Sequence, residues 1–138
     1  MNNNIAPDGL YIFEGLSDKE TAYFIMMSET LFVKTGTIIM SEGDVSNDRA
    51  YFIQSGNVEI YRDGNKIATL GAGDLFGELA LITNEPRTAT VKVSKNAELM
   101  QFGKEEFLML YKKSDLYDAI KFKILGRVKE NFYNKVDA

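Results

Sequence analysis

One short segment of the chain, Phe76–Val91, combines residue types that can hold a small phosphorylated ligand. It reads FGELALITNEPRTATV and places a glycine, a carboxylate and an arginine around a short apolar turn. Arg87 offers a planar fork of N–H donors that matches a phosphate. Glu78 offers an acceptor for a sugar hydroxyl, and Gly77 lets the backbone approach where a Cβ would clash. The segment therefore predicts a site for a phosphorylated ligand that also carries a hydroxyl group.

The backbone of this segment favours the same interpretation. A short helical turn over Gly77–Leu81 would aim its first N–H groups at one point, which is an anion site. Pro86 fixes its own φ and biases Glu85 away from helix, which defines the exit of the loop before Arg87. The pattern leaves one alternative open, because a carboxylate and an arginine at this spacing can also form a plain structural salt bridge.

Composition and charge describe an ordinary globular chain. Its 138 residues predict one domain, with 45% apolar and 26% charged residues. The net charge is −4 and the basic residues form no block, so we expect no nucleic-acid partner. The start of the chain lacks a signal peptide and no apolar run approaches the roughly 18 residues that span a bilayer. We therefore expect a cytoplasmic protein without membrane contact.

The missing residue types limit the chemistry. The chain has no cysteine and no histidine, so disulfides, thiolate nucleophiles and the usual zinc sites are excluded. The commonest general base near neutral pH is absent as well. A jelly-roll enzyme of the cupin kind would need histidine metal ligands. We therefore expect a protein that is not an enzyme and that uses neither a cofactor nor a metal.

The chain divides into a helical segment at about 10–30, a β-rich segment at about 31–103 and a second helical segment at about 104–136. Ser17 and Glu20 match a capping box that starts a helix running through Met27. Short β-branched or apolar runs between glycine turns then predict strands. These are Leu31–Lys34, Thr37–Met40, Tyr51–Ile53, Val58–Tyr61, Lys66–Leu70, Thr88–Val93 and Glu98–Phe102.

Two glycine-containing stretches in the β-rich part are interpreted as turns. Ser55–Asn57 lies between two strand runs and predicts a hairpin turn. Gly71–Asp74 invites comparison with a dinucleotide motif, but the third glycine would have to stand at position 76, where the residue is Phe76. We therefore interpret Gly71–Asp74 as a tight turn between strands.

The second helical segment begins with Lys104–Tyr111 and continues in a longer helix from near Ser114. Its apolar residues recur every four positions, so one face of the longer helix is apolar. They are Leu116, Ile120, Ile124, Val128, Phe132 and Val136. We expect this face to pack on the domain, although a homodimer seam or a mobile lid would use the same pattern.

Taken with its surroundings, Phe76–Val91 resembles the phosphate-binding cassette of the cyclic nucleotide-binding domain family. Glu42–Asp44 and Gly71–Asp74 are similar to that family too, and the resemblance extends from about residue 10 to 135. It implies a mainly β fold with flanking helices. The expected architecture is an eight-stranded antiparallel, jelly-roll-like β-roll with an N-terminal helix, a short cassette helix and C-terminal helices. The implied ligand is cAMP or cGMP.

The resemblance also implies roles for the residues of the cassette. Glu78 and the backbone of Gly77 would hold the ribose 2′-hydroxyl, and Arg87 would hold the cyclic phosphate. The amides that join Arg87 at the phosphate would be those of Leu79, Ala80 and Thr88. Ala89 would lie beside the phosphate.

Other positions would complete the site. Ile60 and Val91 would offer apolar surface near the ribose and base. Phe132 and Tyr133 are the candidates for a lid from the C-terminal helix, and an aromatic lid would stack on the base.

The implied function is a sensor that binds a cyclic nucleotide and signals by moving its C-terminal helix toward an unidentified effector domain or protein. The hydroxyl of Thr88 could accept a hydrogen bond from the amine of guanine, so cGMP stays open although we expect cAMP. A related transcription factor would need a helix-turn-helix after the long helix, and the sequence ends too soon after that helix to supply one, so we do not expect this function. The alternative is a degenerate β-roll that serves as a structural or interaction module.

Overall fold

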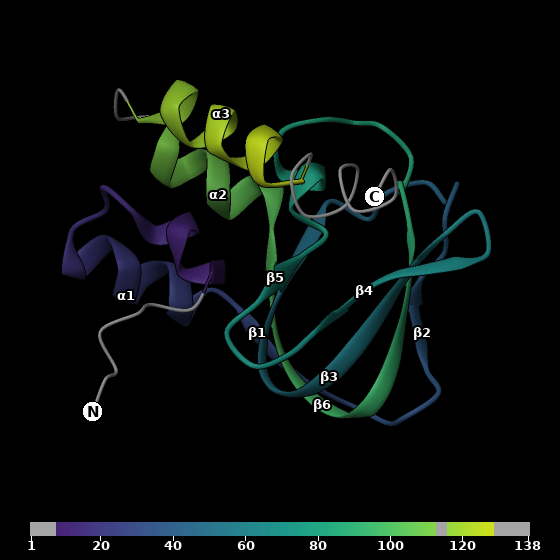
Figure 1. Cartoon of the computed structure of the whole chain (residues 1–138). Helices are drawn as coiled ribbons and strands as arrows, with labels where there is room; N and C mark the ends of the chain where they lie inside the picture. The colour runs from purple at the N-terminus through teal and green to yellow at the C-terminus, as the bar shows by residue number, and fades with distance from the viewer. Residues whose placement is uncertain (1–7, 113–115, 129–138) are drawn as a thin grey trace.

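The computed structural model describes residues 8–112 and 116–128 and shows an antiparallel sheet with helices gathered at one side (Figure 1). In chain order the elements are η1 (Asp8–Phe13), α1 (Asp18–Met26), β1 (Glu29–Val33), β2 (Ile38–Met40), β3 (Arg49–Arg62), β4 (Asn65–Leu70), β5 (Leu75–Phe76), η2 (Glu78–Leu81), β6 (Thr90–Gly103), α2 (Lys104–Tyr111) and α3 (Tyr117–Val128). The mainly β fold with flanking helices that the sequence predicts is confirmed.

The first α-helix begins where the sequence predicts. The Ser17 hydroxyl accepts a hydrogen bond from the Glu20 N–H at 3.1 Å, and the Glu20 carboxylate accepts one from the Ser17 N–H at 2.9 Å. This reciprocal pair satisfies two N–H groups that the helix itself leaves unpaired. The predicted capping box is therefore confirmed. Met27 caps the other end of the helix.

The two long strands β3 and β6 pair with each other along their length and form the centre of the roll. Each takes different outer partners along its two halves. β6 pairs with β1 at one end and β2 at the other, while β3 pairs with β5 and then β4. Each long strand thereby includes two of the strands predicted from the sequence. When the two halves of β3 and of β6 are counted as separate strands, the six strands become the eight of the expected β-roll.

The prediction of a hairpin turn at Ser55–Asn57 is wrong, because β3 runs straight through these residues. Gly56 has φ +85° and lies where the register between β3 and β6 shifts. A Cβ on Gly56 would lie 2.2 Å from the carbonyl oxygen of Asn96. The glycine therefore serves a bulge at a close approach between two backbones, instead of a reversal of the chain.

The core has two parts that meet at β6. One fills the roll and includes Ile53, Val58 and Leu99. The other lies between the roll and the helices, where Phe24 of α1 packs edge-on against Phe102 of β6 with the ring centroids 4.8 Å apart. The helices are thus joined to the same strand that follows the cassette.

The apolar face predicted for the longer helix packs on the domain. Ile120, Ile124 and Val128 of α3 are all buried, so the expected packing is confirmed, and in this conformation the row is not an exposed dimer seam. On the other side of α3, Phe122 is 80% exposed. The predicted continuation of this helix to Val136 lies outside the described residues.

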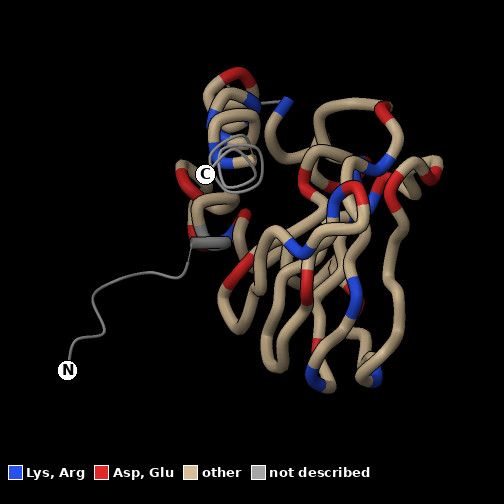
Figure 2. The backbone as a smooth tube through the Cα atoms, turned by 45° about the vertical axis from the view of Figure 1, so that its right-hand side comes forward, with Lys and Arg blue, Asp and Glu red and all other residues tan. Residues whose placement is uncertain are grey.

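Charged residues are dispersed over the described part of the chain. Figure 2 shows lysine and arginine interspersed with aspartate and glutamate along the backbone. No helix in residues 8–112 and 116–128 has the length and apolar character needed to cross a lipid bilayer.

Candidate functional site

The structure brings nine predicted site residues to one cavity. They are Ile60, Gly77, Glu78, Leu79, Ala80, Arg87, Thr88, Ala89 and Val91. They come from β3, from η2 with the loop after it, and from the start of β6. Further residues that line the cavity are Met40, Ser46, Phe76, Glu85, Pro86 and Val128.

Gly77 connects β5 to η2 in a conformation that favours glycine. Its φ is +76°, in the left-handed region where a Cβ is strained. A Cβ would also lie 3.1 Å from Arg87 Nη1 and 3.3 Å from the carbonyl oxygen of Arg49. The turn therefore lets the guanidinium lie directly against the backbone of the cassette.

Arg87 is a buried cation whose guanidinium is held by acceptors of the protein itself. Nη1 donates to the carbonyl oxygen of Gly77 at 3.2 Å, and Nη2 donates to the carbonyl oxygen of Arg49 at 2.9 Å and to Oδ1 of Asn47. A guanidinium has five N–H donors, so two are left for a ligand. The position and direction of the charge are thus set by the fold.

Burial lowers the pKa of Arg87 below its usual value, while Tyr51 and Asp48 act in the opposite direction. An arginine side chain remains protonated in proteins despite such a shift. With only 7% of the residue exposed, its charge is poorly solvated. A phosphate anion that enters the cavity would meet a cation with little competing water.

The backbone of Arg87 is fixed by the loop that precedes β3. The Arg87 N–H donates to the carbonyl oxygen of Asp44 at 2.8 Å, and the Gly43 N–H donates to the carbonyl oxygen of Arg87 at 2.8 Å. These bonds explain why the Glu42–Asp44 motif accompanies the cassette in the sequence. Asn47, which holds the side chain of Arg87, carries no sequence signal that singles it out.

Glu78 is the buried acid of the cavity, with 4% of the residue exposed. Its Oε2 accepts a hydrogen bond from the hydroxyl of Tyr11 at 3.2 Å. Burial raises the pKa of Glu78 to about 7, against the hydrogen bonds from its own backbone and from Tyr11 and the charge of Arg127. It forms no ion pair with Arg87, so the alternative of a structural salt bridge between the two is excluded.

Two of the three amides predicted at the phosphate are free. Within the described residues, the N–H groups of Leu79 and Thr88 have no hydrogen-bond partner. The Ala80 N–H instead donates to the carbonyl oxygen of Gly77 at 3.2 Å. The tight turn of η2 closes this i to i+3 hydrogen bond, and the role of the Ala80 amide at a phosphate stays a prediction.

The remaining predicted residues line the cavity as well. Ile60 and Val91 are paired across β3 and β6 and both are buried. The carbonyl oxygen of Thr88 accepts a hydrogen bond from Nε of Arg62 at 3.3 Å, whereas the Thr88 hydroxyl has no partner among the described residues. That hydroxyl is available to a ligand.

The lid candidates Phe132 and Tyr133 lie outside the described residues. The helix that leads to them does reach the site, because Val128 at the end of α3 lines the cavity. The sequence marked Val128 only as part of an apolar row. Tyr11, which holds Glu78, had no signal in the sequence.

A family model described as "Cyclic nucleotide-binding domain" matches residues 30–114. The chain belongs to the cyclic nucleotide-binding domain family. A cGMP-dependent protein kinase of Plasmodium berghei is 40% identical over 102 residues, which are 73% of this chain and 12% of that kinase. The chain thus spans about an eighth of the length of this curated relative.

Solved structures share the fold. The catabolite activator protein of Thermus thermophilus superimposes with a TM-score of 0.75 at 26% identity, over 91% of this chain and 61% of that one. The regulatory domain of Toxoplasma gondii PKA, crystallised with cAMP, gives a TM-score of 0.68 at 31% identity, over 72% of this chain and 40% of that one. These similarities support the β-roll and the family, and they place regulatory proteins among its relatives.

Proposed function

We propose that the cavity binds a cyclic nucleotide and that the domain reports its presence without catalysing a reaction. The observation that carries the proposal is the state of Arg87. It is buried, oriented by three protein acceptors, and left with two free N–H donors beside the free amides of Leu79 and Thr88. A cyclic phosphodiester carries one negative charge, which this set of donors matches.

The proposed pose follows from the distribution of donors and acceptors in the cavity. The cyclic phosphate lies at Arg87 with Ala89 beside it, and the ribose 2′-hydroxyl lies at Glu78 and the backbone of Gly77. The base lies over the apolar surface of Ile60 and Val91. The lid from Phe132 or Tyr133 stays a prediction.

The base is selected at Thr88 in this proposal. The sequence favours cAMP, and the unpartnered Thr88 hydroxyl also offers an acceptor for the exocyclic amine of guanine. We therefore expect cAMP and cGMP both to bind, with Thr88 setting their ratio.

Titration calorimetry of the wild type and Thr88→Ala with each nucleotide tests ligand and selectivity together. We expect binding of both nucleotides to the wild type and a loss of about fivefold in cGMP affinity in the variant, from one hydrogen bond of about 1 kcal/mol. The cAMP affinity should stay within twofold. Absence of binding by either nucleotide would contradict the proposed function and favour the structural module.

The proposed output is a change at α3, because the last described residue of that helix lines the cavity. Ligand binding would shift the helix between pre-existing positions and so act on an effector domain or protein in the cytoplasm. Hydrogen exchange along α3 with and without nucleotide measures this effect.

A further inference from the structure

The hydroxyl of Tyr11 connects the N-terminal helical segment to the acid of the cavity. Tyr11 lies in η1, is 8% exposed, and donates to Oε2 of Glu78 at 3.2 Å across 67 residues of sequence. It is the one side-chain hydrogen-bond donor to Glu78 within the described residues. A buried carboxylate with a single such donor depends on it for its orientation.

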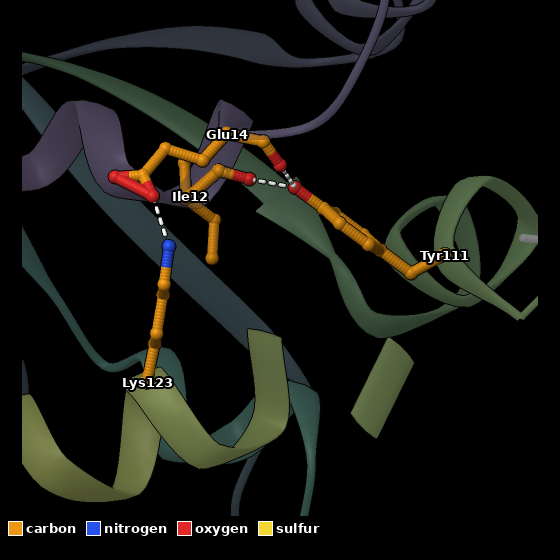
Figure 3. A network of polar contacts seen from close by, with 4 residues as sticks. All are labelled: Ile12, Glu14, Tyr111 and Lys123. Atoms are coloured by element: carbon orange, nitrogen blue, oxygen red, sulfur yellow. Dashed lines mark hydrogen bonds and ion pairs between the residues drawn. The ribbon is translucent and has the colours of Figure 1, made fainter. Parts of the chain in front are cut away.

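The segment that carries Tyr11 is tied to both C-terminal helices. Figure 3 shows the hydroxyl of Tyr111, from α2, donating to the carbonyl oxygens of Ile12 and Glu14, and the ammonium of Lys123, from α3, pairing with the carboxylate of Glu14. One turn further along α3, the guanidinium of Arg127 lies over the ring of Tyr11, 4.7 Å from its centroid. Tyr11 therefore touches Glu78 with its hydroxyl and α3 with its ring.

We propose that Tyr11 is a positioning residue of the ribose site, which holds the Glu78 carboxylate for a 2′-hydroxyl and, through Arg127, makes this hold depend on the position of α3. The inference rests on the proposed function, since it concerns the sugar of the same ligand. A carboxylate has about four lone-pair sites, so the bond from Tyr11 leaves room for the sugar hydroxyl. A cation over the face of the ring restrains its orientation, and with it the direction of the O–H.

A substitution that deletes only the hydroxyl, Tyr11→Phe, tests the proposal when it is combined with a change in the ligand. We expect the variant to lose about tenfold in affinity for cAMP, the equivalent of one hydrogen bond to a charged acceptor. Its affinity for 2′-deoxy-cAMP, which offers nothing to Glu78, should stay within twofold of the wild type. Titration calorimetry on the full chain gives the ratio of the two affinities for each protein.

Two control variants separate positioning from a general loosening of the fold. Tyr61→Phe removes a hydroxyl that donates to Glu59 at 2.8 Å, outside the residues that line the cavity, and should leave the ratio unchanged. Tyr111→Phe loosens η1 from α2 without removing a donor to Glu78, so any change in the ratio should be smaller than in Tyr11→Phe. Equal losses of both ligands in Tyr11→Phe would overturn the proposal. A wild type that binds neither ligand would instead contradict the proposed function itself.

The link to α3 is tested with Arg127→Gln, which also decides the matter if Tyr11→Phe folds poorly. We expect this variant to lower the preference for cAMP over 2′-deoxy-cAMP about threefold, and to have a smaller effect when Tyr11 is already Phe, because only the direct action of the Arg127 charge on Glu78 then remains. An unchanged preference in Arg127→Gln, or equal effects in both backgrounds, would show that α3 does not act through Tyr11.

Discussion

The two ends of the cavity are built in different ways. At one end the cation Arg87 is held by Asn47, Arg49 and Gly77, all of which belong to the roll or to its loops. At the other end the acid Glu78 is held by Tyr11 from the helical segment. The end that we propose for the phosphate (the phosphate end) is therefore complete within the roll, whereas the end that we propose for the ribose (the ribose end) depends on contacts between the roll and the helices.

The side chains at the two ends, Arg87 and Glu78, also differ in how firmly they keep their charge. Arg87 keeps its charge because the pKa of a guanidinium is so high that burial does not deprotonate it. Glu78 has a pKa raised to about 7, mainly because it is buried. The phosphate end is a permanent cation, and the ribose end is an acid close to its titration point. The proposed site would thus have one contact of fixed charge and one whose charge changes with pH near neutrality.

The largest loss of nucleotide affinity is expected from a substitution at the phosphate end. Arg87→Ala should weaken binding of cyclic nucleotide by about 30-fold or more, because removal of a buried charge partner costs about 2–5 kcal/mol. Calorimetry with cAMP measures the loss. Arg87→Lys keeps the charge without the planar fork, so its affinity should lie between those of the wild type and Arg87→Ala. The control Lys66→Ala removes an exposed ion pair with Glu59 and should bind as the wild type does. An Arg87→Ala variant with unchanged affinity would remove the basis of the comparison.

The ribose end predicts a pH dependence of stability. In the unfolded chain Glu78 loses its proton near pH 4.5, and in the folded protein near pH 7. Between these values the folded state binds more protons than the unfolded state, so the contribution of Glu78 to stability falls as the pH rises, by about 3 kcal/mol in total, and levels off about one pH unit above the folded pKa. The hydrogen bond from Tyr11 and the positive charge of Arg127 act to lower the pKa of Glu78 and so limit this fall.

Glu78→Gln isolates this contribution, since the amide does not titrate. We expect the free energy of unfolding of the wild type to decline relative to the variant between pH 5 and pH 7, as measured by urea unfolding at several pH values. Parallel pH profiles for the two proteins would show that the buried acid has an ordinary pKa.

The same contrast explains what could be predicted from the sequence. The cassette is contiguous, so the order of Gly77, Glu78 and Arg87 carries the phosphate end in a single segment. At Gly56 the sequence predicts a turn where the structure has a bulge, because a glycine between two strand runs has the same local signal in both, and only the close approach to Asn96 distinguishes them. Tyr11 was missed because its partner lies 67 residues away, and nothing local to Tyr11 reports that distance.

A smaller effect is predicted at Asn47, and it tests how far the fold presets the orientation of Arg87. Asn47→Ala removes the side-chain acceptor of Arg87 and leaves the two backbone acceptors in place. If the guanidinium is oriented mainly by the backbone, the loss in nucleotide affinity should be about fivefold, the equivalent of one hydrogen bond of about 1 kcal/mol. Calorimetry that instead found a loss as large as that of Arg87→Ala would mean that one side chain sets the orientation. The orientation of Arg87 would then depend on one contact with another side chain, as we propose for Glu78 and Tyr11.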